Sequence, residues 1–285
     1  SILKIGNCET LMSRYGIHES RQGALQLPKY LIRRKGMLKL SLNGMWRMRE
    51  VTGSRVIPAQ VPGSVMSALL ANGLTEDPYF RDNEYKAREM FRKDYEFQRE
   101  FTIAKEFYEN EKIELACYGL DTLAEIYIND KLLAKTNNMH RTWRLECKSF
   151  LQSGKNHMKI VFRSPITYIE NYKPEEGKEI HYLADGVMKD NQYIRKAHSM
   201  FGWDWGIQLP DMGIWRDIEF IAFSDARLTD VDIIQHHEEG SVRLEINTAL
   251  EVLQEKPYLL KYEWIAPDGS KKSYQCSTNG ASASY

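Results

Sequence analysis

Short segments in which apolar and polar residues alternate make up most of the chain after Met37. In residues 93–103 (KDYEFQREFTI), every second residue from Tyr95 to Ile103 falls on one face, and three of these five residues are aromatic. An alternation with a period of two is typical of a strand that buries one face. Similar segments occupy residues 112–120, 156–164 and 213–223, and residues 124–136 are expected to form a hairpin that turns at Asn129-Asp130-Lys131. The pattern therefore predicts a chain built mainly from antiparallel strands.

One segment has the features of a helix instead. Residues 62–73 (PGSVMSALLANG) offer Ser64 as an N-cap and Gly73 just past the end of the helix. Four apolar side chains would share one face of this helix, namely Val65, Met66, Leu69 and Leu70. Many short strands with one short helix predict an all-β fold, an antiparallel sandwich of jelly-roll type over residues 37–224.

The pattern changes after about residue 224. Residues 227–250 and 259–276 each contain two strand-like segments joined by a polar turn, which predicts two hairpins of a second β domain. We expect residues 225–285 to form an incomplete immunoglobulin-like β-sandwich, because such a sandwich needs roughly 100 residues. The sequence is therefore expected to be a fragment of a longer protein. Residues 1–36 show no sustained periodicity, and we expect them to be an extension of uncertain origin.

Composition and charge exclude several classes of function. The formal net charge is zero, so the chain has no overall basic field to attract nucleic acid or an anionic membrane. The four cysteines are too dispersed for a disulfide framework or a paired-cysteine metal site, and Cys117 is expected to be a buried core thiol. No run of 18 apolar residues occurs, and residues 1–16 lack a secretory pattern. We expect a cytoplasmic protein without a metal or cofactor, unless a secretory signal was removed.

Residues 201–220 (FGWDWGIQLPDMGIWRDIEF) contain three of the six tryptophans and hold Asp204 between Trp203 and Trp205. Aromatic faces stack on the C–H patches of sugars, and carboxylates pair with sugar hydroxyls. The motif therefore suits a sugar site, and it follows a long, weakly patterned connection of the kind that often carries function. In extended backbone, Asp204 would point away from the two indoles.

An alternative is that these tryptophans fill a core. A buried carboxylate needs a partner, and Arg195 or Lys196 would then neutralise Asp204 from within the chain. Two other features carry less weight. His236-His237 point to opposite faces of a strand, which makes a poor metal site, and Asn83-Glu84 lies in a charged linking stretch. No pair of carboxylates suited to glycoside hydrolysis stands out.

Four stretches taken together resemble the N-terminal half of a β-mannosidase of glycoside hydrolase family 2. They are LNGMW (42–46), VPGSVMSALLANGLTEDPYFRDNE (61–84), YGLDTLAEIYINDKLLAKTNNMHRTW (118–143) and FGWDWGIQLPDMGIWRDI (201–218). The last stretch is the most specific, because a Trp-Asp-Trp-Gly run followed by Gly-Ile-Trp is similar to β-mannosidases rather than to the β-galactosidase or β-glucuronidase branches. One departure is Ile207-Gln208, where relatives usually have a proline.

The resemblance implies a galactose-binding-like jelly roll, an immunoglobulin-like sandwich and, further along, a TIM barrel that carries two catalytic glutamates. It implies an exo-acting, retaining enzyme that releases mannose from terminal β-D-mannosides. This chain would end before the barrel, so no catalytic residue is expected in it. Its expected contribution is the loop of Trp203, Asp204 and Trp205, which would help to hold the terminal mannose of a mannoside or oligosaccharide.

Three other functions stay open on the sequence alone. The chain could be a free-standing carbohydrate-binding β-sandwich. It could belong to another family 2 enzyme, a β-galactosidase or a β-glucuronidase. It could also be a scaffold domain with no part in substrate binding.

Overall fold

The computed structural model describes residues 2–4, 37–180, 185–265, 269–278 and 282–284. Apart from Ile2–Lys4, the proposed extension over residues 1–36 lies outside the described residues. The chain divides into two compact units. One comprises Lys39–Ala222, and the described part of the other comes from the chain's two ends, up to Leu38 and from Phe223 onward.

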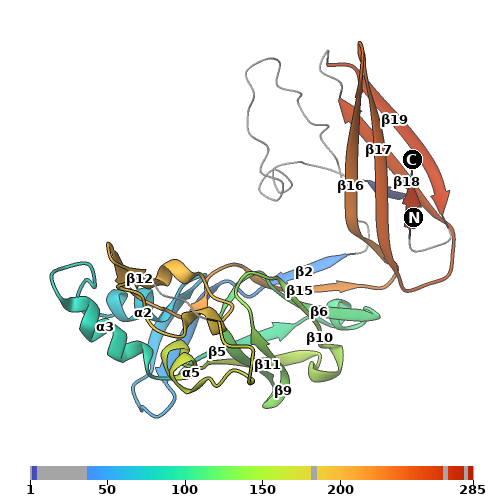
Figure 1. Ribbon diagram of the computed structural model, residues 1–285. Coiled ribbons are helices and arrows are strands. Elements are labelled where there is room, and N and C mark those ends of the chain that lie inside the picture. The colour runs from blue at the N-terminus through green and yellow to red at the C-terminus, as the bar shows by residue number, and fades with distance from the viewer. Residues whose placement is uncertain (1, 5–36, 181–184, 266–268, 279–281, 285) are drawn as a thin grey trace. The chain divides into compact units, whose positions relative to one another are not determined.

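The larger unit is a two-layer β-sandwich (Figure 1). The six-stranded sheet has the order β4 (Ile57–Val61), β3 (Gly44–Glu50), β5 (Tyr95–Ile103), β11 (Gly154–Phe162), β8 (Leu123–Ile128) and β9 (Lys131–Asn137), and every neighbouring pair is antiparallel. The four-stranded sheet has the order β10 (Trp143–Glu146), β6 (Lys112–Cys117), β15 (Ile218–Phe223) and β2 (Leu38–Ser41). The predicted all-β fold of jelly-roll type is confirmed.

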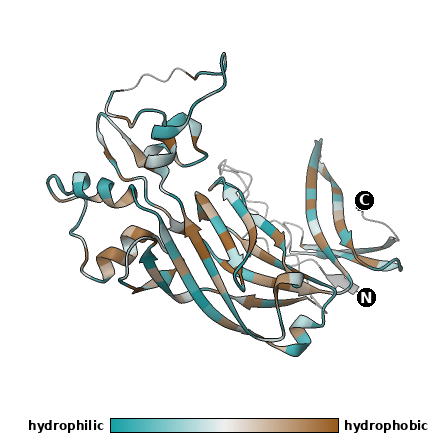
Figure 2. Cartoon of the chain, turned by 90° about the horizontal axis from the view of Figure 1, so that it is seen from below, coloured by the Kyte–Doolittle hydropathy of each residue, from teal (hydrophilic) through white to brown (hydrophobic). Residues whose placement is uncertain are grey.

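The core lies between these two sheets and follows from the alternation in the sequence. Hydrophobic and hydrophilic residues alternate along the strands in Figure 2, and the apolar ones face inward. The rings of Phe101 on β5 and Phe220 on β15 lie 5.2 Å apart between centroids, which places the two layers in direct contact. Cys117 is fully buried on β6, as expected, and burial raises the pKa of its thiol.

The predicted helix forms as α2 (Val65–Ala71), and Ser64 caps it. The Ser64 hydroxyl accepts a hydrogen bond from the amide of Ser67, and Gly73 follows the helix with a φ of 63°. The expectation of one helix was wrong, because α3 (Asn83–Phe91), α4 (Lys105–Tyr108) and α5 (Pro165–Asn171) also form. Short 3-10 helices span Lys148–Phe150 (η1), Asn191–Tyr193 (η2) and His198–Met200 (η3).

Sequence analysis did not predict helix α3, because this helix buries only a narrow stripe of side chains. The buried residues are Asn83, Ala87 and Phe91, which recur every four residues. Two of these three are not strongly apolar, and four of the nine residues in the segment are charged, so the sequence gives little periodic signal and tertiary packing determines this helix.

The smaller unit contains two three-stranded sheets. In the first, β16 (Ala226–Glu238), β17 (Ser241–Val252) and β20 (Ser282–Ser284) are antiparallel. In the second, β1 (Ile2–Lys4) runs parallel to β18 (Tyr258–Ile265), which pairs antiparallel with β19 (Lys271–Thr278). The strands of both predicted hairpins pair, and residues 266–268 in the predicted turn of the second lie outside the described residues. Ile246, Leu250, Leu260 and Tyr262 are buried as a separate core. The immunoglobulin-like identity of this unit stays a prediction.

Candidate functional site

The Trp-Asp-Trp motif forms the tip of a β-hairpin. Strands β12 (Phe201–Trp203) and β13 (Gly206–Gln208) are antiparallel, with Trp203 opposite Gly206. Asp204 and Trp205 are therefore the two turn residues. The extended backbone considered for this motif is wrong, so alternation along a strand does not decide the direction of Asp204.

The tip is exposed rather than packed into a core. Trp203 is 40% exposed, Trp205 is 81% exposed, and Asp204 is exposed as well. The two indole rings contact each other with centroids 5.5 Å apart and planes tilted by 36°. In the described chain, the alternative in which Trp203 and Trp205 fill a core is therefore wrong. The tip presents two aromatic faces and a carboxylate to its surroundings.

The base of the hairpin is firmly anchored. Phe201 is fully buried in a small cluster with Ile169 and Ile194, and its carbonyl accepts a hydrogen bond of 2.9 Å from the amide of Met188. Gly202 has a φ of 89°, a conformation that residues with a Cβ rarely adopt. The strand thus turns outward immediately after a buried aromatic anchor.

A buried ion pair connects both sides of the hairpin to the sandwich. Lys196 precedes β12, its side chain is 0% exposed, and its ammonium group pairs with the Asp121 carboxylate. The same ammonium group donates to the carbonyl oxygen of Asp211, which follows β13, at 2.6 Å. Asp121 lies on β7 (Leu120–Asp121), which pairs with β14 (Gly213–Ile214). Lys196 therefore neutralises Asp121, so the alternative in which Lys196 is the internal partner of Asp204 is wrong.

Burial shifts the protonation of this network. Desolvation lowers the pKa of Lys196, and the neighbouring Asp121 carboxylate opposes the shift. Burial raises the pKa of Asp211 to about 6 from its ordinary value of 3.8. The Asp211 carboxylate accepts hydrogen bonds from the amides of Met66 at 3.1 Å and Met212 at 2.7 Å, which favour the charged form. The root of the hairpin therefore titrates closer to neutral pH than an exposed aspartate would.

Asn83 and Glu84 have structural contacts. Asn83 begins α3, is buried, and donates from its side-chain amide to the carbonyl of Asp77 at 3.0 Å. Glu84 accepts a hydrogen bond of 3.3 Å from the amide of Gln208 on β13. Sequence analysis missed this contact because 124 residues separate the two partners. Figure 1 shows α3 and β12 at the same end of this unit.

The remaining candidate features carry no site chemistry. His236 lies 3.1 Å from Glu245 across the β16–β17 hairpin. Among the described residues no group of three or more histidine, cysteine, aspartate or glutamate residues could hold a metal ion. The described part of the chain contains no helix long and apolar enough to cross a membrane.

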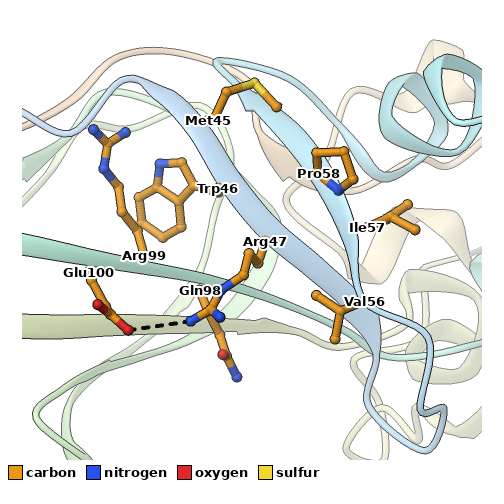
Figure 3. Close-up of a pocket in the computed structure, with 9 residues that line it drawn as sticks. All are labelled: Met45, Trp46, Arg47, Val56, Ile57, Pro58, Gln98, Arg99 and Glu100. Atoms are coloured by element: carbon orange, nitrogen blue, oxygen red, sulfur yellow. Dashed lines mark ion pairs between the residues drawn. The ribbon is translucent and has the colours of Figure 1, made fainter.

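A separate pocket lies on strands β3, β4 and β5 (Figure 3). Its volume is about 640 Å³, and its lining consists of Met45, Trp46, Arg47, Val56, Ile57, Pro58, Gln98, Arg99 and Glu100. The indole of Trp46 is buried and donates to the carbonyl of Leu42 at 2.8 Å, so it offers no free face for a sugar. Arg47 and Glu100 form a solvent-exposed ion pair at 3.6 Å, which contributes little to binding. The hairpin tip is the better candidate site.

Comparison with known proteins agrees with the fold. A family model described as "Glycosyl hydrolase 2 galactose-binding domain-like" matches residues 46–216. The mouse β-mannosidase is 32% identical over 226 residues, which are 76% of this chain and 25% of that protein. The goat β-mannosidase is 31% identical over 199 residues, or 67% of this chain and 22% of that protein.

Solved structures show the same fold. The β-D-mannosidase of Dictyoglomus thermophilum matches with a TM-score of 0.75 and 27% identity, over 87% of this chain and 30% of that chain. The β-D-glucuronidase of the same organism matches with a TM-score of 0.55 and 15% identity, over 88% of this chain and 38% of that one, a likeness of fold alone. The chain spans about a quarter of the length of the curated relatives it matches.

Replacement of Lys196 by Met should destabilise the larger unit by about 3–5 kcal/mol, because it leaves the Asp121 carboxylate buried without a cation. Urea unfolding measures this change. The double variant Asp121→Asn/Lys196→Met should recover part of the loss, since no isolated charge then remains. Equal destabilisation of the single and double variants would contradict a charge-based role.

The pKa of Asp211 gives a pH-dependent prediction. Between about pH 4 and pH 6 the folded chain keeps a proton on Asp211 that the unfolded chain has released. This group's contribution to stability is therefore present at low pH and is lost as the pH rises through about 6. Asp211→Asn keeps the acceptor oxygen but cannot titrate.

Unfolding free energies measured from pH 4 to pH 7 should show the unsubstituted protein losing up to about 3 kcal/mol relative to Asp211→Asn. The relevant quantity is the difference between the two proteins, because other carboxylates titrate in both. A difference that stays constant across this range would show that Asp211 does not titrate in it.

Proposed function

The chain belongs to the glycosyl hydrolase 2 galactose-binding domain-like family, and from this membership we propose that it is the N-terminal, non-catalytic part of an exo-acting β-mannosidase. The complete protein would hydrolyse terminal β-D-mannosides with retention. Similarity to β-mannosidases over about three quarters of this chain supports the substrate class. The match to only about a quarter of those relatives supports the division into a non-catalytic part and a remainder.

The exposed hairpin tip is the observation that carries the proposal. Trp203 and Trp205 offer aromatic faces, and each sugar contact with such a face adds about 0.5–1.5 kcal/mol beyond the area buried. Asp204 can accept hydrogen bonds from sugar hydroxyls, which are worth roughly 1.5–3 kcal/mol each when one partner is charged. This combination recognises a polyhydroxylated ring that has both C–H and O–H surfaces.

The chemical step would take place on the remainder of the protein. Retaining hydrolysis needs a general acid that protonates the glycosidic oxygen and a carboxylate, about 5–5.5 Å away, that attacks the anomeric carbon. The resemblance assigns both roles to glutamates of a C-terminal barrel, which is the expected intramolecular partner. The hairpin would bind the terminal mannose and fix its orientation toward those two groups.

The exposed tip also suits a second candidate function, a carbohydrate-binding module that acts without an attached enzyme. Such a module would have to bind sugar through the hairpin alone. A partial pocket ordinarily binds weakly, because walls that would exclude water are missing. We therefore favour the enzyme part over the free-standing module.

Asp204→Ala in the complete gene product should lower kcat/KM for an aryl β-mannoside by about 10- to 100-fold, the loss of one charged hydrogen bond. Steady-state kinetics measure it. Glu106→Ala is the matched control, because Glu106 is exposed on α4, far from the hairpin. Helix α3, which contacts the hairpin, precedes β5, and α4 follows it, so the length of β5 separates the two helices by about 30 Å. Unchanged kinetics for Asp204→Ala would favour a scaffold role for this unit.

The 285-residue chain alone should show no measurable turnover of an aryl β-mannoside, because the proposal places both catalytic carboxylates elsewhere. A pure preparation is assayed beside the complete gene product at equal molar concentration. Turnover that follows the 285-residue chain through purification would contradict the non-catalytic assignment.

A further inference from the structure

Gln208 is the residue at which the hairpin, helix α3 and the loop around Gly186 meet. It ends β13 opposite the buried Phe201. Its main-chain amide donates to the Glu84 carboxylate at 3.3 Å, and its side-chain amide nitrogen donates to the carbonyl of Gly186 at 2.8 Å. Its side-chain oxygen accepts a hydrogen bond from the guanidinium of Arg88. Three segments distant in sequence are thus joined through one side chain and its backbone.

The contacts require an amide at this position. A glutamine side chain donates and accepts at the same time, whereas a carboxylate only accepts and an ammonium only donates. Glu84 and Arg88 lie four residues apart on α3, so they face the hairpin from the same side of the helix. The guanidinium of Arg88 is also held over the ring of Tyr85, at 4.7 Å from its centroid.

Two glycines allow the backbone to approach this half-buried side chain closely. A Cβ atom placed on Gly202 would lie 2.4 Å from Cγ of Gln208 and 2.8 Å from the Gly186 carbonyl oxygen. A Cβ atom on Gly186 would lie 2.6 Å from the carbonyl oxygen of Trp203. The side chain of Gln208 therefore rests directly on the backbone that leads into the tip.

The tip itself is more exposed than its base. Asp204 and Trp205 are exposed, and Trp205 has a ring contact with Trp203, which belongs to the same hairpin. Both strands that lead into the tip are held at the base, where Phe201 anchors one strand and Gln208 the other. A change at the base would move the tip without removing a group that touches sugar.

We propose that Gln208, held by Arg88, Glu84 and Gly186, is a positioning residue that sets the orientation of Trp203, Asp204 and Trp205 toward the substrate. The inference rests on the proposed function and extends it. Gln208 touches no reacting atom. It acts through the hairpin, and its contribution should depend on the presence of Asp204.

The first readout is independent of activity. The complete gene product is labelled with 5-fluorotryptophan, and the resonances of Trp203 and Trp205 are assigned with Trp→Phe variants. Gln208→Ala should shift or broaden both resonances, and Arg88→Ala, which removes one contact from the other side, should do so in the same direction. Gln98→Ala is the matched control, because Gln98 is a half-buried glutamine on β5 whose amide donates to Glu96.

The second readout is kinetic. Gln208→Ala should lower kcat/KM for an aryl β-mannoside by ~10- to 100-fold, since a displacement of about 1 Å in a binding group can cost that much. The same substitution in an Asp204→Ala background should add less than twofold. Gln98→Ala should change neither the spectra nor the kinetics.

Two results would overturn the positioning role. The first is that Trp203 and Trp205 keep their resonances in Gln208→Ala. The second is that the loss of kcat/KM in the double variant equals the product of the losses in Gln208→Ala and Asp204→Ala. An unsubstituted protein without mannosidase activity would contradict the proposed function instead, and the fluorine spectra would still decide whether Gln208 orients the hairpin. Arg88→Ala keeps the test valid if Gln208→Ala fails to fold.

Discussion

The buried pair of Lys196 and Asp121 is the interaction on which the candidate site depends. Withdrawing two charges from water costs several kcal/mol for each ion, and only good geometry with further hydrogen bonds offsets that cost. Here the ammonium group also donates to the carbonyl of Asp211 at 2.6 Å. One cation thereby joins the segment entering the hairpin, the segment leaving it, and strand β7 of the sandwich. The hairpin can project outward because its two ends are fixed inside.

The contrast between base and tip has a physical meaning. Phe201 is fully buried at the base of the hairpin. Trp205, the second residue of its turn, is 81% exposed. A large aromatic surface left in water at the end of a rigid support commonly marks a place where another surface binds. The support restricts the tip to few orientations, so a ligand or partner surface need not order the loop when it binds.

Much of this architecture could be predicted from the sequence, because the deciding patterns are local. The period of two along residues 93–103 fixed a strand, Ser64 fixed the start of α2, and Asn129-Asp130 formed the expected hairpin turn with both φ angles positive. Contacts that span long separations could not be predicted. Asp121 is 75 residues from Lys196, and Glu84 is 124 residues from Gln208. The sequence pattern around each of these residues does not indicate which distant residue it contacts.

The exposure of Asp204 explains why the hairpin would form only one side of a site. In water, a hydrogen bond to this carboxylate replaces one to solvent, so its net contribution to binding is small. If a second surface covers the tip, the effective dielectric falls and the same hydrogen bond becomes stronger, while an unpaired carboxylate becomes costly. Covering the tip would therefore increase both affinity for the correct sugar and discrimination against one that leaves Asp204 unpaired. A rigid hairpin on a β-sandwich would supply the oriented groups, and specificity would arise when the remainder of the proposed pocket excludes water from them.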